Sequence, residues 1–242
     1  MKPLRALAFL ILAAVSIPAK AGPPYLTDDP VPTDLAHWEL NAFTAADGHR
    51  GVFDGAAGVD INYGGLKDVQ LTATVPLGVS RDQAGTLHSG TGDLELAVKY
   101  RFVHDEKSGV SAAIFPRAIL PSSTLDHDER TRLLLPVWVQ RDFAGGTTLF
   151  GGGGYAINPG TGNRNFWQAG AALTQELDDR ISVGAELIRQ GSGSVGAPRQ
   201  TSAGIGAIVN LSDRYSLLTS VGPTWRNHRA NYHVYVALGV NY

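Results

Sequence analysis

The chain has 242 residues, of which 43% are hydrophobic and 17% are charged, and its formal net charge is −2. This near-neutral balance excludes the basic footprint expected of a nucleic-acid-binding protein. The absence of cysteine excludes a disulfide scaffold and any metal site built on thiolates.

The N-terminus has the three parts of a secretory signal peptide. Lys2 and Arg5 form a basic region, residues 6–17 are apolar, and Ala19-Lys20-Ala21 has the small-x-small pattern of a cleavage site. We therefore expect residues 1–21 to be removed and the mature chain to begin at Gly22. No later run of about 18 apolar residues predicts a transmembrane helix.

Residues 22–36 are rich in proline and show no periodicity. The stretch GPPYLTDDPVPTD contains four prolines, which prevent a regular helix or an inner strand. Two interpretations stay open: a periplasmic lead-in, or a segment that tucks into the lumen of a barrel.

From residue 37 to the C-terminus the chain alternates between apolar and polar residues, as β-strands do. The clearest strand is 94–102, in which Glu95, Lys99 and Arg101 share one face; a helix would spread these charges around its surface. Loops are expected at about 45–56, 76–93, 121–131 and 222–231, alternating with short turns. The predicted strands are approximately 37–43, 59–63, 69–75, 94–102, 110–120, 132–143, 147–156, 165–176, 181–190, 201–209, 215–221 and 232–242.

This pattern predicts an all-β fold, a transmembrane antiparallel up-and-down β-barrel of about twelve strands, since an even strand number with alternating turns and longer loops is typical of outer-membrane barrels. A closed sheet also leaves no backbone N–H or C=O unpaired in lipid. Interfacial aromatic belts would draw on a scattered set of residues: Trp38, Tyr63, Tyr100, Trp138, Trp167 and Tyr242.

The last eleven residues are typical of the C-terminal assembly signal of Gram-negative outer-membrane barrels. The chain ends on an aromatic residue, and apolar residues occupy every second position before it. We expect this strand to be read by the barrel-assembly machinery through one face: Val234, Val236, Leu238, Val240 and Tyr242.

The charged residues on the polar faces of the strands should point into the lumen. They could line a pore that passes small polar solutes, or they could pair with one another and plug the interior. The predicted pore-lining residues are Glu39, Asp60, Glu95, Lys99, Arg101, Arg117 and Glu186.

Two loops carry other candidate sites. Asp126-His127-Asp128-Glu129 places carboxylates around a possible general base, although a solvated charged loop is the simpler interpretation and no second half of a catalytic site is evident. Arg226, His228 and Arg229 make the last loop basic, which suggests contact with lipopolysaccharide phosphates. No enzyme activity, metal or organic cofactor is predicted.

Several stretches resemble the family of outer-membrane β-barrel transporters labelled meta-pathway of phenol degradation. They are GPPYLTDDP at 22–30, HWEL at 37–40, GTGDLELAVKYRF at 90–102 and GGGGYAINPG at 151–160. The resemblance implies a barrel, no catalytic residues, and passage of small molecules such as aromatic or hydrophobic compounds. The expected function is thus an outer-membrane channel surrounded by lipid and lipopolysaccharide. The alternative is a closed structural or surface-interaction barrel without transport.

Overall fold

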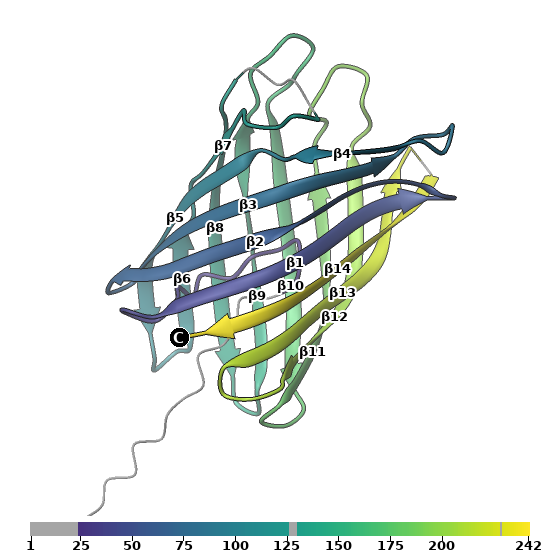
Figure 1. The fold of residues 1–242 in the computed structure, drawn as a ribbon. Coiled ribbons are helices and arrows are strands. Elements are labelled where there is room, and N and C mark those ends of the chain that lie inside the picture. Colours follow the sequence, from purple (N-terminus) through teal and green to yellow (C-terminus); the bar gives the residue numbers. More distant parts are fainter. Residues whose placement is uncertain (1–23, 126–129, 228) are drawn as a thin grey trace, which may run out of the picture.

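The computed structural model describes residues 24–125, 130–227 and 229–242, which form a closed antiparallel β-barrel (Figure 1). The predicted signal peptide lies outside the described residues. No helix of the described part is long and apolar enough to cross a membrane. The strands are β1 (Trp38–His49), β2 (Val52–Leu66), β3 (Val69–Arg81), β4 (Leu87–Thr91), β5 (Leu94–Asp105), β6 (Val110–Ile114), β7 (Arg117–Leu120), β8 (Arg132–Phe143), β9 (Thr147–Ile157), β10 (Phe166–Glu176), β11 (Ile181–Gln190), β12 (Gln200–Asn210), β13 (Tyr215–Arg226) and β14 (Arg229–Asn241).

These segments make twelve barrel strands, so the predicted fold class is confirmed. Two barrel strands are each interrupted once. β4 and β5 both pair with β3 and together form one barrel strand, and β6 and β7 both pair with β5 and β8 and together form another. The second interruption falls at Phe115-Pro116, where proline has no N–H for the ladder but its carbonyl still accepts from the N–H of Val98 at 3.1 Å. The ring closes where β1 pairs with β14.

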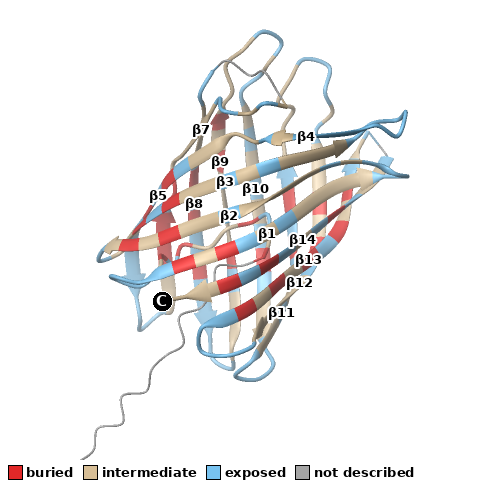
Figure 2. Ribbon diagram, viewed as in Figure 1, coloured by how far each residue is buried: buried red, intermediate tan, exposed pale blue. Residues whose placement is uncertain are grey.

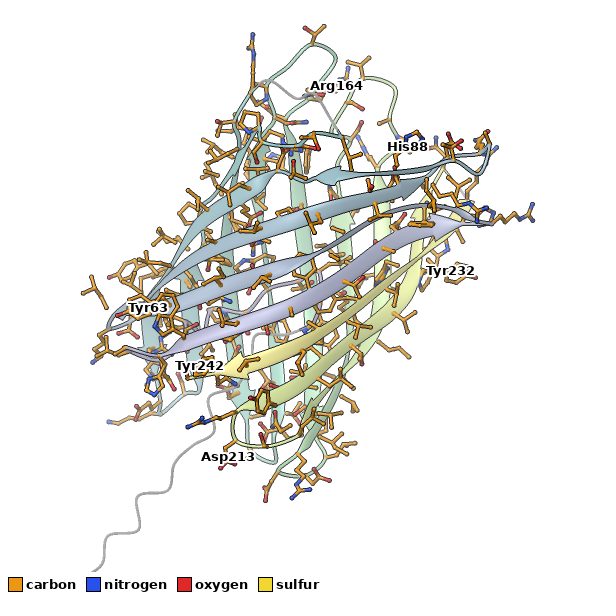
Figure 3. The ribbon with its side chains drawn as sticks, viewed as in Figure 1. Tyr63, His88, Arg164, Asp213, Tyr232 and Tyr242 are labelled. Carbon is orange, nitrogen blue, oxygen red and sulfur yellow. The ribbon has the colours of Figure 1, made fainter. Side chains whose placement is uncertain are left out.

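The two ends of the barrel differ. The C-terminus lies at one end, here called the turn end, together with the short connections β2–β3, β5–β6, β8–β9, β10–β11 and β12–β13. The opposite end, the loop end, is where β7, β9 and β11 end and β8, β10 and β12 begin, and its connections include residues 158–165 and 191–199. Figure 3 shows Asp213 and Tyr242 toward the turn end and Arg164 at the loop end.

Three predicted loops are wrong. Residues 45–56 belong to β1 and β2, which continue to His49 and from Val52 around a two-residue turn. Residues 222–231 likewise belong mostly to β13 and β14. Much of 76–93 is a hairpin of β3 with β4. In each case the backbone ladder continues although glycine, alanine and polar residues interrupt the apolar pattern.

Burial alternates along the strands, as Figure 2 shows for β13 and β14, because successive side chains of a strand point to opposite faces of the barrel wall. In β5, Val98 and Tyr100 are exposed on the outer face, whereas Lys99 is buried. Large apolar residues are exposed on nearly every strand, and an apolar outer surface of this extent suits lipid better than water.

One predicted aromatic-belt residue points the other way. Trp138 is 1% exposed and packs inside the barrel against Ala97 and Phe115. The three leucines at the start of β8 obscure which face is apolar, and the alternation is evident only from Val137 and Val139, which are exposed. Near the turn end, the rings of Trp38 and Tyr63 stack at 4.4 Å.

Candidate channel lumen

The segment before β1 contacts side chains that point into the barrel. Asp28 is its centre: one carboxylate oxygen lies 3.0 Å from Nζ of Lys99 (β5), and the other accepts a hydrogen bond from Arg117 (β7). Asp29 adds a second carboxylate 3.5 Å from the same ammonium. Lys99 is only 4% exposed, so its charge depends on these partners.

The same segment also contacts the opposite wall. The backbone N–H groups of Leu26 and Thr27 each donate to the Glu186 carboxylate (β11) at 3.0 Å. The hydroxyl of Ser220 (β13) donates to the carbonyl of Pro24 at 2.6 Å. In the ring order β11–β13 lie across the barrel from β5 and β7, so these contacts span the lumen.

Glycines in the barrel wall make room for this segment. A Cβ at Gly184 or Gly206 would lie within 3 Å of the Tyr25 ring or its hydroxyl, and one at Gly170 would approach the Thr27 hydroxyl. Side chains at these positions would fill the recess. The glycines of β10–β12 therefore shape the wall around the first turn of the segment.

The segment then leads into the first strand. Thr33 donates from its N–H to the Gln70 amide oxygen (β3) at 2.8 Å. Ala36 donates to the carbonyl of Gly64 at 2.7 Å. Residues 24–36 thus cross between opposite walls and return to the turn end, where β1 begins; we call them the lumen segment.

The remaining predicted residues face inward but have different surroundings. Glu95 pairs with Arg117 at 3.3 Å, and Asp60 accepts from the Thr74 hydroxyl. Glu39 is buried and accepts from the Asn41 amide at 2.8 Å. Arg101 is different, because it pairs at 2.6 Å with Asp68 in the β2–β3 turn, away from the others.

Asp28 and Asp29 are not among the lumen residues that the alternating pattern predicts. The available signal was charge complementarity: two adjacent acids in a segment without structure of its own, together with the basic inward positions Lys99 and Arg117. A partner for those cations was required, because a buried unpaired charge is costly.

Toward the loop end a cavity of about 380 Å³ remains. Its wall combines apolar residues with amide side chains and one guanidinium, so it can contact an apolar surface and donate or accept hydrogen bonds. The residues that define this character are Ile119, Leu134, Phe166, Asn158, Gln168 and Arg132.

The structure adds no support for the candidate catalytic site at Asp126–Glu129 or for the candidate phosphate-binding site in the basic last loop. Asp126-His127-Asp128-Glu129 lies outside the described residues, as does His228. Arg226 pairs with Asp47 at 2.7 Å and with the Gln200 amide oxygen at 3.0 Å, so its guanidinium is already occupied within the barrel mouth. In the described part of the chain, no group of three or more acidic or histidine residues could hold a metal ion.

The fold is similar to solved outer-membrane channels. The COG4313 outer membrane channel from Pseudomonas putida F1 matches 86% of this chain and 96% of its own length, with a TM-score of 0.66 and 11% identity. The NanC porin matches 83% of this chain and 98% of its own length, with a TM-score of 0.60 and 9% identity. The KdgM porin matches 84% of this chain and 98% of its own length, with a TM-score of 0.60 and 7% identity. No family model matches the chain, and no curated protein matches it. The likeness is therefore one of fold.

Proposed function

We propose that this chain is an outer-membrane channel for the passive passage of small molecules. The observation that carries the proposal is a closed barrel with an apolar outer face and an interior lined by polar and charged groups. The predicted signal peptide and the likeness to channel and porin barrels support export to the outer membrane. By the usual layout of such barrels, the turn end faces the periplasm and the loop end faces outside.

The loop-end cavity supports a solute class. Ile119, Leu134 and Phe166 offer an apolar surface beside amide groups, which fits small aromatic or hydrophobic compounds that carry a polar substituent. This agrees with the resemblance to the phenol-degradation transporter family. Among the predicted pore-lining residues, we propose that Glu95, Lys99 and Arg117 hold the lumen segment in place. The segment in turn narrows the route of solutes through the barrel.

Conductance tests the proposal directly. We expect the refolded mature protein to give discrete, reproducible current steps in a planar lipid bilayer, because water and ions can follow the polar lumen. Addition of a phenolic compound should reduce the current as it occupies the cavity. A Gln168→Trp variant, which fills the cavity, should show smaller steps.

A closed structural barrel is the second candidate, and one observation favours it. The lumen segment is tied to both walls by ion pairs and hydrogen bonds, which would suit a permanent plug. Absence of current from protein shown to be folded would support this alternative over the channel.

The C-terminal strand makes a separate prediction about assembly. The backbone of Tyr242 exchanges two hydrogen bonds with Trp38, at 2.9 and 3.1 Å, while its side chain is 60% exposed. Tyr242→Ala should therefore leave in vitro stability nearly unchanged. In cells it should reduce the amount of assembled barrel, if the machinery reads the aromatic ring.

The measurement is the fraction of heat-modifiable barrel in outer-membrane extracts, compared with unfolding of the refolded variant. The matched control is Tyr232→Ala, because Tyr232 lies in β14 and is as exposed as Tyr242. Equal assembly of the two variants would argue against a role of the terminal ring as a signal.

A further inference from the structure

A groove on the outside of the barrel carries three arginines. It has a volume of about 470 Å³ and lies near the loop end, where β10 and β11 meet the start of β12. Its lining includes Arg164, Arg189 and Arg199 together with Trp167 and Ala169. Arg164 marks this end of the molecule in Figure 3.

The strand register places these residues on the lipid-facing surface. Ala169 of β10 lies opposite Arg189 of β11, and both are exposed. Trp167, which is 69% exposed, lies two residues along the same face. Because side chains two residues apart in a strand point the same way, Trp167 and Ala169 form an apolar wall beside the Arg189 guanidinium.

Two loops bring the other arginines to the groove. The N–H of Arg164 donates to the carbonyl of Gly193 at 2.9 Å, which ties the 158–165 loop to the 191–199 loop. Arg199 ends the second loop, next to the first residue of β12. The groove is therefore built from a fixed pair of loops and two strands.

The charge of the groove is not balanced by the protein. Its lining contains no aspartate or glutamate. Within residues 24–125, 130–227 and 229–242, no ion pair joins any of the three arginines to a carboxylate. Arg101, Arg117 and Arg132, by contrast, each pair with an acid.

We infer that this groove binds the phosphorylated glucosamine headgroup of lipid A, the lipid of the outer leaflet. Guanidinium groups bind phosphate through paired charge-assisted hydrogen bonds. Trp167 and Ala169 would contact the first part of an acyl chain, since tryptophan suits the boundary between headgroup and hydrocarbon. The inference rests on the proposed location in the outer membrane and is independent of whether the barrel conducts.

Binding of purified lipid A to the mature protein in detergent tests the inference. The probe is bisphosphorylated lipid A, measured by native mass spectrometry, with lipid A stripped of both phosphates as the comparison. Arg164→Ala/Arg189→Ala/Arg199→Ala should bind the phosphorylated form at least about tenfold more weakly, because a single charge-assisted hydrogen bond already contributes that much.

The matched control is Arg141→Ala/Arg180→Ala/Arg214→Ala, which removes three exposed arginines at the turn end and should bind as the native protein does. Equal binding by both triple variants, or equal binding of lipid A with and without phosphates, would overturn the inference. So would displacement of lipid A by inorganic phosphate at equal concentration, since the site would then recognise a free anion.

Conductance of the same variants separates this inference from the channel proposal. In bilayers without lipid A, the triple variant at the groove should conduct as the native protein does. A native protein that is silent but binds lipid A would overturn the channel and leave the groove site standing.

Discussion

Replacing Asp28 by asparagine is expected to release the lumen segment and raise the conductance of the barrel. The substitution removes the carboxylate shared by Lys99 and Arg117, which then keep Asp29 at 3.5 Å and Glu95 at 3.3 Å, respectively, as acidic partners. Removing one partner of a buried ion pair costs about 3–5 kcal/mol. Because Asp29 and Glu95 remain beside the two cations, we expect the lower end of this range. A free-energy change of about 1.4 kcal/mol changes an equilibrium constant tenfold, so docking of the lumen segment should weaken by about two orders of magnitude.

Single-channel current and chemical labelling measure this release together. The chain has no cysteine, so a Thr27→Cys reporter would be its only thiol. Thr27 is fully buried, and its replacement should react slowly with a water-soluble maleimide in the native background. In the Asp28→Asn background it should react much faster, and the current steps should be larger.

The control is Asp34→Asn, the same chemical change in the same segment at an exposed side chain. It should alter neither labelling nor current. If Asp28→Asn behaves like this control, the ion pairs do not hold the segment in the lumen. Faster labelling without larger current would mean that the segment moves but does not limit the flow of ions.

The second large effect is expected on the outer face of the barrel. Val236 lies midway along β14 with its side chain pointing outward. Val236→Arg should lower the free energy of unfolding by about 2–4 kcal/mol, the cost of arginine at the bilayer midplane. Tyr232→Arg, on the same face near the loop end, should cost about 0–1 kcal/mol because the guanidinium can reach water.

Equilibrium unfolding of refolded protein in phospholipid vesicles, followed by tryptophan fluorescence in guanidinium chloride, gives both values. Working without the assembly machinery keeps effects on the C-terminal signal out of the measurement. Equal destabilisation at both depths would be incompatible with a lipid-facing β14.

The barrel architecture could be predicted from sequence because alternation alone defines a wall with an apolar and a polar face. The 94–102 strand shows why: its charges occupy every second position, and the structure buries Lys99 while exposing Val98 and Tyr100. Such a pattern specifies the facing of a strand without information about its neighbours.

Strand ends could not be predicted in the same way. In the β1–β2 hairpin, Ala45 pairs with Ala56 and Gly48 with Phe53, so the ladder continues where the side chains carry no alternating signal. Hydrogen bonds between the two backbones keep these residues in the strands. The pattern of side chains in a sequence does not show which backbones will pair. The same reason explains the wrong loop at 222–231.

The lumen site could be predicted only in part. Alternation indicated which charges point inward, but it could not pair Lys99 with a residue of a proline-rich segment 70 positions earlier. That pairing depends on the path of residues 24–36 across the barrel, which no local pattern specifies. Arg101 also points inward as alternation predicts, but its ion-pair partner is Asp68 in the β2–β3 turn and not a residue of the lumen segment. The direction of a side chain therefore does not identify its partner.

The seam between β1 and β14 has a consequence for how the protein is made. Leu40 pairs with Val240, so the first strand acquires its second neighbour only when the last strand has been synthesised. Until then the sheet has two open edges, each a row of unpaired backbone groups able to join another chain. Contacts of such long sequence separation also form slowly. The barrel can therefore close only when both ends of the sheet are present, and a chain that lacks its last strand would keep both edges open to pairing with another chain.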